Sequence, residues 1–318
     1  MTLDDKIKEA ERTLKLGAEM SEYYYHKPLI ICYSGGKDSD VMLDIAKRCL
    51  KPNEFEVLNS HTTVDAPDTV YHIREVFQKC ESEGIKTTVK MPSWKGKPTS
   101  MWRLIEERTS PPTRLARYCC EVLKETTTPN RMVAIGVRED ESHKRQGREA
   151  FGVLEPRKSD REYRTTAHTF AMFKLDKFGG EDAYQCKMIQ ACKEHKDTIC
   201  NPIYRFTLRD IWEYVERFNV KMNPLYAKGY KRVGCVGCPL GGGNSMKKEF
   251  SDYPKYRQNY VKAFDRAIQK RKALGKKCLY DNGEDLMKWW IGDNPNQLTF
   301  DDVFPEESRK AGKNEQFN

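Results

Sequence analysis

A six-residue segment at positions 34–39, with the sequence Ser-Gly-Gly-Lys-Asp-Ser, combines the residue types that bind phosphate. The two glycines let the backbone curl, so that successive N–H groups point at one anion. Lys37 adds a full positive charge, and the hydroxyls of Ser34 and Ser39 add further donors. Asp38 is suited either to orient Lys37 or to help place a Mg²⁺ ion. The spacing differs from the Walker A motif, so we expect a phosphate loop of another kind.

Four cysteines form a second group with possible chemistry. Cys119 and Cys120 are adjacent, and Cys235 and Cys238 form a C-x-x-C knuckle bordered by glycines. A tetrahedral zinc site usually takes ligands spaced two to four residues apart in each half, which an adjacent pair fits poorly. Two corners of an iron–sulfur cluster suit such a pair better, so we favour [4Fe–4S] over Zn²⁺. Buried thiols or a redox-active C-x-x-C are the simpler alternatives.

The elements around the loop alternate between strand and helix over the first 140 residues. Apolar runs predict strands, and amphipathic segments predict helices between them. This alternation indicates βαβ units and a parallel sheet, which binds ligands at the carboxyl ends of its strands. The loop, Asn59 and Gly136 all follow such strands, so we expect them at one edge of the sheet. The predicted strands cover residues 29–33, 55–58, 85–89 and 131–137, and the predicted helices cover residues 4–25, 67–80 and 101–107.

Beyond the first 140 residues, the sequence no longer alternates between strand and helix patterns. We expect a nucleotide-binding α/β domain at residues 1–200, including a polar insertion at about 142–200. A helical region at residues 201–318 follows and carries the C-x-x-C knuckle. Thr207 caps one of its helices with Asp210 at the capping-box position. Tyr253, Tyr256 and Tyr260 interleave with basic residues, a pattern that suits single-stranded nucleic acid, although their spacing favours a helix face packed on the core.

Composition narrows the class of protein. The chain has 318 residues, a net charge of +9 and 11 cysteines. The sequence contains no apolar run of membrane-spanning length and no secretory signal, so we expect a cytoplasmic protein without a membrane partner. A reducing compartment disfavours structural disulfides and favours metal or catalytic roles for cysteine. The positive charge is consistent with a polyanionic partner or an anionic substrate.

Three segments together resemble a known family. The 34–39 segment resembles the PP-loop of the adenine-nucleotide α-hydrolase superfamily, and more narrowly that of the phosphoadenosine phosphosulfate reductase family. The stretch at 136–142, with Arg145 after it, is similar to that family's G-x-R-x-x-x-S-x-x-R, and residues 201–230 resemble its C-terminal half. The resemblance implies a HUP-like, doubly wound, mainly parallel sheet with a mostly helical, cysteine-containing extension. It also implies cleavage of ATP between its α and β phosphates, with Mg²⁺.

We combine the loop, the strand ends and the resemblance into a predicted site. The predicted catalytic residues are Lys37, Asp38 and Arg138. The predicted nucleotide- and phosphate-binding residues are Tyr33, Ser34, Gly35, Gly36, Lys37, Asp38, Ser39, Asn59, His61, Gly136, Arg138 and Arg145. The predicted metal ligands are Cys119, Cys120, Cys235 and Cys238.

The remaining cysteines bear on the reaction. A Cys-Cys pair followed by C-x-x-C resembles the cluster ligands of adenylyl-sulfate reductases and of ATP pyrophosphatases in DNA phosphorothioation. The reductases also carry a late Glu-Cys-Gly-Leu-His motif, whereas the late Cys278 here has no Gly-Leu-His after it. Cys186, Cys192 and Cys200 form a loose group that we interpret as thiols of a polar loop, with a second metal or a transferable sulfur as the alternative.

The leading hypothesis is an ATP pyrophosphatase of sulfurtransferase type that adenylates a nucleic-acid backbone, with DNA favoured, for sulfur incorporation. The resemblance implies a cysteine desulfurase or another sulfur-donor protein as partner. One alternative is a sulfonucleotide reductase that acts on adenylyl sulfate or its 3′-phosphorylated form, with thioredoxin as reductant. A second alternative is a sensor that binds nucleotide and cluster without turnover.

Overall fold

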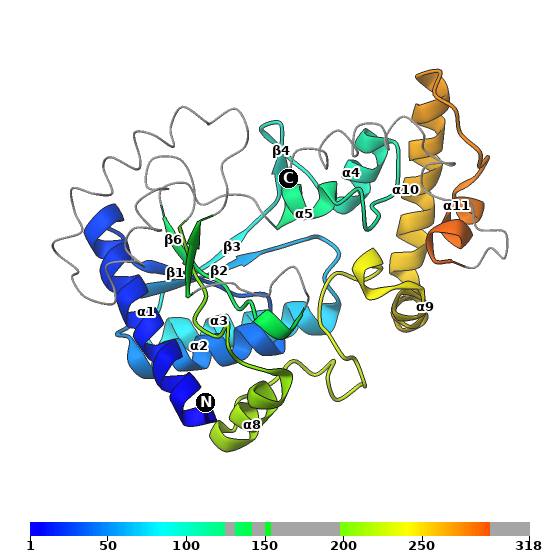
Figure 1. Cartoon of the computed structure of the whole chain (residues 1–318). Coiled ribbons are helices and arrows are strands. Elements are labelled where there is room, and N and C mark those ends of the chain that lie inside the picture. Colours follow the sequence, from blue (N-terminus) through cyan, green and yellow to red (C-terminus); the bar gives the residue numbers. More distant parts are fainter. Residues whose placement is uncertain (125–130, 142–149, 154–197, 293–318) are drawn as a thin grey trace. The chain divides into compact units, whose positions relative to one another are not determined.

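The computed structural model describes residues 1–124, 131–141, 150–153 and 198–292 (Figure 1). The chain forms two compact units, which we describe separately. Unit 1 comprises Met1–Asn59, Pro67–Lys90 and Thr127–Val233, and unit 2 comprises Ser60–Ala66, Met91–Thr126 and Gly234–Asn318. This division does not coincide with the boundary expected at residue 200, because residues 201–233 belong to unit 1 and two N-terminal segments belong to unit 2. Among the described residues, no helix is both long and apolar enough to cross a bilayer.

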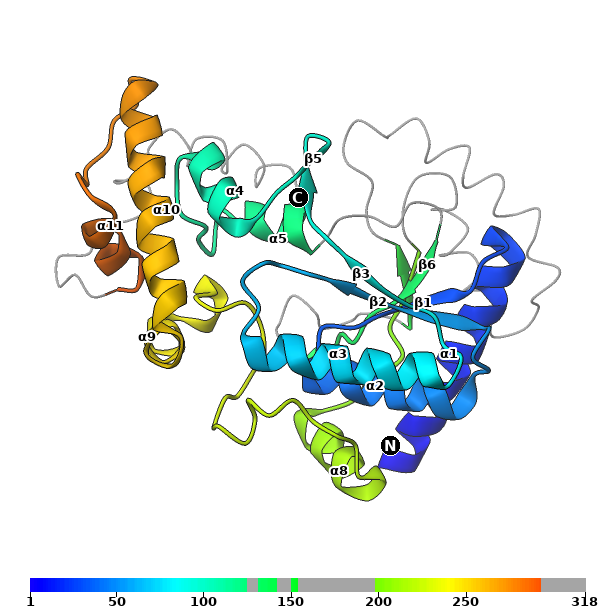
Figure 2. The ribbon, with the colours of Figure 1, turned by 180° about the vertical axis from the view of Figure 1, so that it is seen from behind.

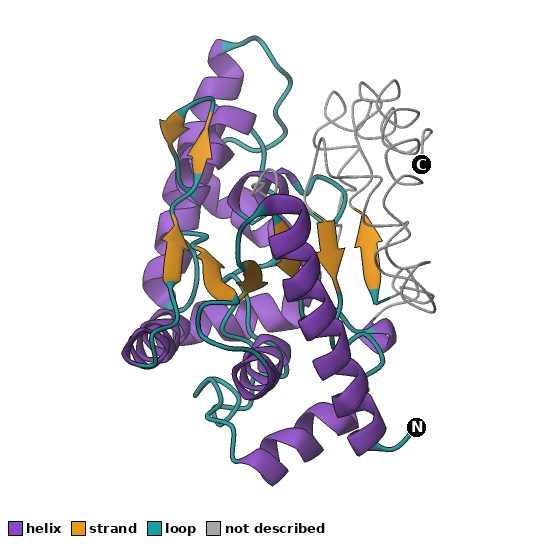
Figure 3. Cartoon of the chain, turned by 90° about the vertical axis from the view of Figure 1, so that its left-hand side faces the viewer, coloured by secondary structure: helices purple, strands orange, loops and turns teal. Residues whose placement is uncertain are grey.

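Unit 1 is built on a mainly parallel sheet (Figure 3). Within the described residues it has six strands in the order β3-β2-β1-β6-β8-β7. The pairs β1–β2, β1–β6 and β6–β8 are parallel, and β7 runs antiparallel to β8 at the edge. The strands are β1 (Leu29–Cys32), β2 (Phe55–Ser60), β3 (Thr87–Lys90), β6 (Met132–Ala134), β7 (Phe151–Val153) and β8 (Thr198–Cys200). The expected α/β fold is therefore confirmed.

Helices flank this sheet. The long α1 packs against β1, β6 and β8, and α2 and α3 run side by side along the sheet (Figures 1 and 2). Thr2 and Thr207 cap α1 and α8 with capping boxes, the second of which was predicted. The helices of unit 1 are α1 (Leu3–Tyr25), α2 (Lys37–Cys49), α3 (Pro67–Ser82) and α8 (Leu208–Phe218), with a short 3-10 helix at Glu139–Glu141.

The strands β7 and β8 were not predicted, and β8 corrects the interpretation of Cys200. This residue lies in β8, where its side chain is fully buried in the core of unit 1. Burial raises the pKa of its thiol well above the ordinary value. Cys200 is thus a core residue and not a thiol of a polar loop, whereas Cys186 and Cys192 lie outside the described residues. The two strands have three residues each, too few to show a periodicity in the sequence.

Unit 2 is mostly helical, as expected for the C-terminal region. Aromatic rings form its core: Tyr260 packs with Trp290 at 4.9 Å and with Trp102 at 4.7 Å between ring centroids. Tyr260 is buried, which confirms the helix-face interpretation of the tyrosine pattern for this residue. The elements of unit 2 are the antiparallel pair β4 (Ser93–Trp94) and β5 (Lys97–Pro98), then α4 (Met101–Arg108), α5 (Tyr118–Leu123), α9 (Gly243–Asp252), α10 (Pro254–Ala273) and α11 (Gly283–Trp290).

Candidate functional site

The phosphate loop is a tight turn between β1 and α2, shaped from inside by Ser39. The Ser39 hydroxyl accepts hydrogen bonds from the amides of Gly36 (3.1 Å) and Ser34 (3.3 Å) and donates to the Gly36 carbonyl (2.8 Å). Gly35 has φ +71°, and a Cβ there would lie 2.9 Å from Ile73 Cγ1. The first glycine is therefore required both by its conformation and by its neighbour. The Ser39 hydroxyl therefore stabilises the loop through hydrogen bonds inside the turn.

Residues from distant parts of unit 1 hold the loop from outside. Asn59 Nδ2 donates to the Tyr33 carbonyl at 2.9 Å, and buried Asn223 Nδ2 donates to the Gly35 carbonyl at 2.8 Å. The Tyr226 hydroxyl accepts a hydrogen bond from the Lys37 amide at 2.9 Å. The sequence prediction assigned no role to Asn223 or Tyr226. Both lie in the 201–230 segment on which the family resemblance rests.

The three predicted catalytic side chains form one charged chain. Asp38 Oδ2 lies 3.1 Å from Lys37 Nζ, and Asp38 Oδ1 accepts from Arg138 Nε at 2.6 Å. Of the two roles considered for Asp38, this geometry matches orientation of Lys37. Gly136 permits the close approach, since a Cβ there would lie 3.3 Å from the Asp38 backbone. The structure therefore brings Lys37, Asp38, Gly136 and Arg138 together at one edge of the sheet.

Arg138 is buried and surrounded by carboxylates. Only 4 % of the residue is exposed, and its guanidinium pairs with Asp140 and Glu141 as well as with Asp38. Each guanidinium nitrogen thus has an acidic partner, so Arg138 positions Asp38 in this structure. Its predicted contact with the phosphates of the nucleotide stays a prediction.

Tyr33 points into the core of unit 1. Its buried hydroxyl donates to Asp40 Oδ1 at 2.5 Å and lies 3.0 Å from His72 Nε2. Burial, reinforced by the Asp40 carboxylate, raises the pKa of Tyr33 and keeps the phenol neutral. The Tyr33 side chain thus ties β1 to α2 and α3, while its backbone carbonyl supports the loop through Asn59.

The four predicted metal ligands all belong to unit 2. A hydrogen bond with Cys120, followed by burial and by the nearby thiols of Cys235 and Cys238, raises the pKa of Cys119. The hydrogen bond from Cys119, together with Arg117, whose Nη2 lies 3.6 Å from Cys120 Sγ, lowers the pKa of Cys120 to about 5. The two halves of the cysteine set therefore lie close enough to influence each other.

Contacts with neighbouring residues fix the backbone conformation of the C-x-x-C knuckle. Gly237 has φ +74°, and a Cβ there would lie 2.5 Å from Phe250 Cζ. The Gly237 amide donates to Glu249 Oε2 at 2.6 Å, and Glu249 Oε1 accepts from the Ser245 hydroxyl at 2.9 Å. An isolated bridge pairs Cys235 with Asp65, and the Val236 amide donates to the Val64 carbonyl at 2.8 Å. The 60–66 segment thus anchors the knuckle.

An adjacent pair such as Cys119 and Cys120 suits two corners of a cluster better than a single zinc ion. In a tetrahedral zinc site all four sulfurs would lie about 2.3 Å from a single ion. Among the described side chains, no group of three or more His, Cys, Asp or Glu is arranged to hold one metal ion. A [4Fe–4S] cluster binds each thiolate to a separate iron, so its ligands stand farther apart. Lys124, whose pKa the Cys235 thiolate raises, adds positive charge beside this set.

Comparison with known proteins identifies the family to which the chain belongs. The model of the phosphoadenosine phosphosulfate reductase domain matches residues 28–240, about two-thirds of the chain. The chain belongs to this family. The matched segment includes the phosphate loop, the Arg138 stretch and all four cysteines.

Individual relatives of this family member are distant or match over short stretches. An uncharacterized protein of Methanocaldococcus jannaschii is 24 % identical over 70 % of this chain and 39 % of its own length. An adenosine 5'-phosphosulfate reductase of Anoxybacillus flavithermus is 43 % identical over 12 % of this chain and 16 % of its own length. The chain thus spans well under half of either relative. A crystal structure of the Candida auris phosphoadenylyl-sulfate reductase has a TM-score of 0.43 at 15 % identity, covering 73 % of this chain and 93 % of that one.

Two further predicted residues belong to unit 2 or fall outside the described residues. His61 belongs to unit 2, where its Nδ1 lies 3.5 Å from Asp65 Oδ2. Arg145 lies outside the described residues. In unit 1, Asp68 at the start of α3 pairs with Lys228 at 2.5 Å. The nucleotide-binding roles of His61 and Arg145 stay predictions.

Replacing Asn223 by alanine should destabilise unit 1 by about 1–3 kcal/mol, because the buried Gly35 carbonyl loses its donor. Asn223 Nδ2 also lies 3.2 Å from Thr69 Oγ1, so the same change loosens α3 from the loop. Urea unfolding followed by tryptophan fluorescence measures the effect. The exposed Asn53, changed to alanine, is the control and should stay within about 0.5 kcal/mol of the wild type. Equal stability of the two variants would contradict this role for Asn223.

Replacing Glu249 by alanine should destabilise unit 2 by about 1–3 kcal/mol, since the Gly237 amide loses its charged acceptor. Glu249→Gln keeps an acceptor oxygen and should recover part of the loss. Glu106, a partly exposed residue that pairs with Arg266 at 3.2 Å, is the control for loss of a carboxylate. Denaturant unfolding of cluster-free protein separates these cases. A Glu249→Ala variant as stable as Glu106→Ala would show that the knuckle does not depend on this contact.

Proposed function

We propose that this chain is an ATP pyrophosphatase that adenylates a nucleic-acid backbone, so that sulfur can replace the activated oxygen. One observation carries the proposal: the Lys37–Asp38–Arg138 chain lies on a glycine-shaped phosphate loop at the end of β1. Membership of the phosphoadenosine phosphosulfate reductase family supports nucleotide chemistry at this loop. The absence of Gly-Leu-His after Cys278 favours adenylation over sulfonucleotide reduction.

The reaction would proceed by attack on the α-phosphate of ATP. An acceptor oxygen forms a bond to the α-phosphorus while the bond to the bridging oxygen of the β-phosphate breaks, so pyrophosphate leaves. Negative charge develops on the leaving group, and Lys37 together with the loop amides stabilises it. Asp38 holds Lys37 in place, and Arg138 holds Asp38. Mg²⁺ would neutralise further charge on the leaving pyrophosphate.

The second half-reaction would replace the activated oxygen by sulfur, with AMP as the leaving group. We propose a cysteine desulfurase or another sulfur-donor protein as the source of this sulfur, with a thiol reductant supplying the two electrons that bring a persulfide's outer sulfur to the phosphorothioate level. Cys119, Cys120, Cys235 and Cys238 would hold a [4Fe–4S] cluster, which would help to deliver or retain the sulfur. A nucleic acid, with DNA favoured, is the proposed acceptor because the chain has a net charge of +9.

A sulfonucleotide reductase is the second candidate, and the short match to an adenosine 5'-phosphosulfate reductase favours it. Cys278 would be the nucleophile, with thioredoxin as reductant. Its thiol is half-buried and lies 3.2 Å from the Tyr280 carbonyl.

A paired assay separates the two candidates. Anaerobically purified protein is incubated with ATP, Mg²⁺ and DNA in one tube, and with adenylyl sulfate and reduced thioredoxin in the other. Pyrophosphate in the first tube alone supports the proposed function. Sulfite in the second tube alone would establish the reductase instead. If neither pyrophosphate nor sulfite forms and nucleotide is still bound, the result would indicate the non-catalytic sensor.

A further inference from the structure

The segment at residues 223–233 lies against the phosphate loop within unit 1. The Lys37 amide donates to the Tyr226 hydroxyl at 2.9 Å. A Cβ placed on Gly36 would lie 3.6 Å from the same hydroxyl and 3.9 Å from Val233 Cβ. Two side chains of this segment, seven positions apart, therefore lie beside the part of the loop that carries the lysine.

Short-range contacts fix the conformation of the segment. The Gly229 amide donates to the Tyr226 carbonyl at 3.0 Å, and Gly229 has φ +81°. The Tyr230 amide donates to the Leu225 carbonyl at 3.1 Å, and both of these side chains are buried. The Tyr226 ring packs edge-on against Trp212 at 5.4 Å between ring centroids. The backbone of the segment and the Tyr226 ring are thus in place before a ligand binds, as preorganised donors must be.

Two hydrogen-bond donors on this segment have no acceptor. The Tyr226 hydroxyl accepts from the Lys37 amide, and no described residue accepts a hydrogen bond from it in turn. Arg232 is exposed and, among the described residues, forms neither a hydrogen bond nor an ion pair. Burial raises the pKa of Tyr226, and the positive charge of Arg232 opposes this rise. Arg232, which directly precedes Val233, thus lies close enough to act on the hydroxyl.

The positive side chains at the loop itself are already paired with carboxylates. Lys37 pairs with Asp38. Arg138 pairs with three carboxylates, those of Asp38, Asp140 and Glu141. Two cations thus face three carboxylates, so this group has no net positive charge. The triphosphate of ATP carries several negative charges, and one Mg²⁺ ion offsets only part of them. A further cation without a carboxylate partner would therefore favour binding of a triphosphate.

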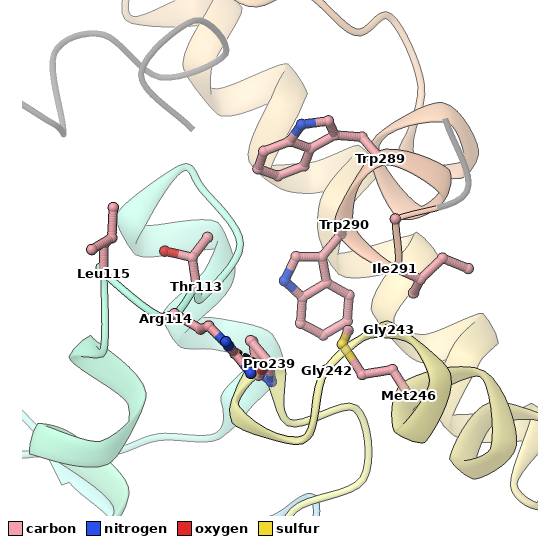
Figure 4. A pocket seen from close by; sticks show the side chains of 11 residues that line it. Thr113, Arg114, Leu115, Pro239, Gly242, Gly243, Met246, Trp289, Trp290 and Ile291 are labelled. Carbon is pink, nitrogen blue, oxygen red and sulfur yellow. Dashed lines mark hydrogen bonds between the residues drawn. The ribbon is translucent and has the colours of Figure 1, made fainter. Parts of the chain in front are cut away.

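An arginine also lines a cavity of about 480 Å³ in unit 2, but its guanidinium already has partners (Figure 4). Arg114 Nε and Nη2 lie 3.3 Å and 3.5 Å from the carbonyls of Pro239 and Leu240. Trp290 and Met246, which line the same cavity, are buried in the core. The free guanidinium beside the phosphate loop is therefore the better candidate for contact with an anion.

We propose that Tyr226 and Arg232 form the second half of the phosphate site and bind the β- and γ-phosphates of ATP, the part that leaves as pyrophosphate. The Tyr226 hydroxyl donates to a phosphate oxygen while it still accepts from the Lys37 amide. Arg232 pairs with the terminal phosphates, for which a planar guanidinium is suited. The inference rests on the proposed function for the identity of the nucleotide, and it adds two residues that stabilise the leaving group.

The test measures ligand binding by the full chain without nucleic acid. Isothermal titration calorimetry in the presence of Mg²⁺, with either inorganic pyrophosphate or AMP, separates the two ends of the nucleotide. Arg232→Gln and Tyr226→Phe should each weaken pyrophosphate binding by about tenfold and leave AMP binding within about twofold of the wild type. Arg232→Lys keeps the charge and should recover part of the loss.

Two exposed residues of the same unit provide matched controls. Arg217 near the end of α8 pairs with exposed Asp4, and Tyr71 lies on the exposed face of α3. Arg217→Gln and Tyr71→Phe remove the same chemical groups elsewhere, so pyrophosphate binding should stay near that of the wild type. Unfolding curves and metal analysis of every variant report effects on the fold and on the cysteine set separately.

Three results would overturn the inference: Arg232→Gln binding pyrophosphate as tightly as Arg217→Gln, an equal loss of pyrophosphate and AMP binding, or weaker DNA binding with pyrophosphate binding unchanged. Its failure is distinguishable from that of the proposed function. Arg232-dependent pyrophosphate binding without DNA-dependent pyrophosphate release would contradict the proposed function alone. DNA-dependent release that neither Arg232→Gln nor Tyr226→Phe slows would contradict this inference alone.

Discussion

Replacing Lys37 by methionine should lower the rate of ATP-dependent pyrophosphate release by about a thousandfold. Only 10 % of the Lys37 side chain is exposed, and Asp38 Oδ2 holds its Nζ at 3.1 Å. The charge is therefore already in place before pyrophosphate begins to leave. Methionine keeps the apolar stem in its packed position, so the variant removes charge with little loss of volume. The release rate is measured at saturating ATP and Mg²⁺.

The matched control is Lys47 in the same helix, which pairs with Glu83 at 2.5 Å. Lys47→Met removes one ion pair from α2 away from the loop, so its release rate should stay near that of the wild type. A Lys37→Met rate within about tenfold of the wild type would contradict the assignment of Lys37 to charge stabilisation. Unfolding curves of both variants report any loss of stability separately from activity.

The proposed cluster predicts that replacing Cys235 by serine abolishes the visible charge-transfer absorption of anaerobically purified protein. Cys235 is buried, and its backbone bridges Asp65, so its position is fixed before metal binds. A hydroxyl is a poor ligand for a cluster that selects soft thiolates. Loss of one of four ligands should therefore cost most of the bound iron, which metal analysis measures directly alongside the absorption.

Cys278 provides the control for this substitution, since it lies in the same unit but outside the four predicted ligands. Cys278→Ser should keep the absorption and the iron content. The same variant addresses the reductase alternative, because it should abolish sulfite formation if Cys278 is the nucleophile. Stoichiometric zinc in wild-type protein, with no iron under aerobic or anaerobic conditions, would contradict the cluster.

The local parts of the phosphate site could be predicted from the sequence. Ser34 to Ser39 lies between an apolar run and an amphipathic segment, so its position at a strand end follows from neighbouring residues alone. Helices α1 and α3 were predicted to within two residues because their apolar faces repeat over several turns. Gly35 has the positive φ that the glycine pair suggests.

Contacts between distant segments could not be predicted. Asn223 reaches the Gly35 carbonyl across 188 positions, and no local pattern marks such a contact. The burial of Arg138 among Asp38, Asp140 and Glu141 likewise depends on the fold. The division into units was missed because the short 60–66 segment pairs with the knuckle near residue 235.

The identity of the products from ATP tests the central claim most directly. Anaerobically purified protein is incubated with ATP labelled at the α-phosphate, Mg²⁺ and DNA, and the products are separated by chromatography. The account predicts release of pyrophosphate with label transferred to DNA as the adenylate or released as AMP, and formation of these products about a thousandfold more slowly in the Lys37→Met variant. Formation of ADP and inorganic phosphate, or pyrophosphate release that does not depend on nucleic acid, would contradict it.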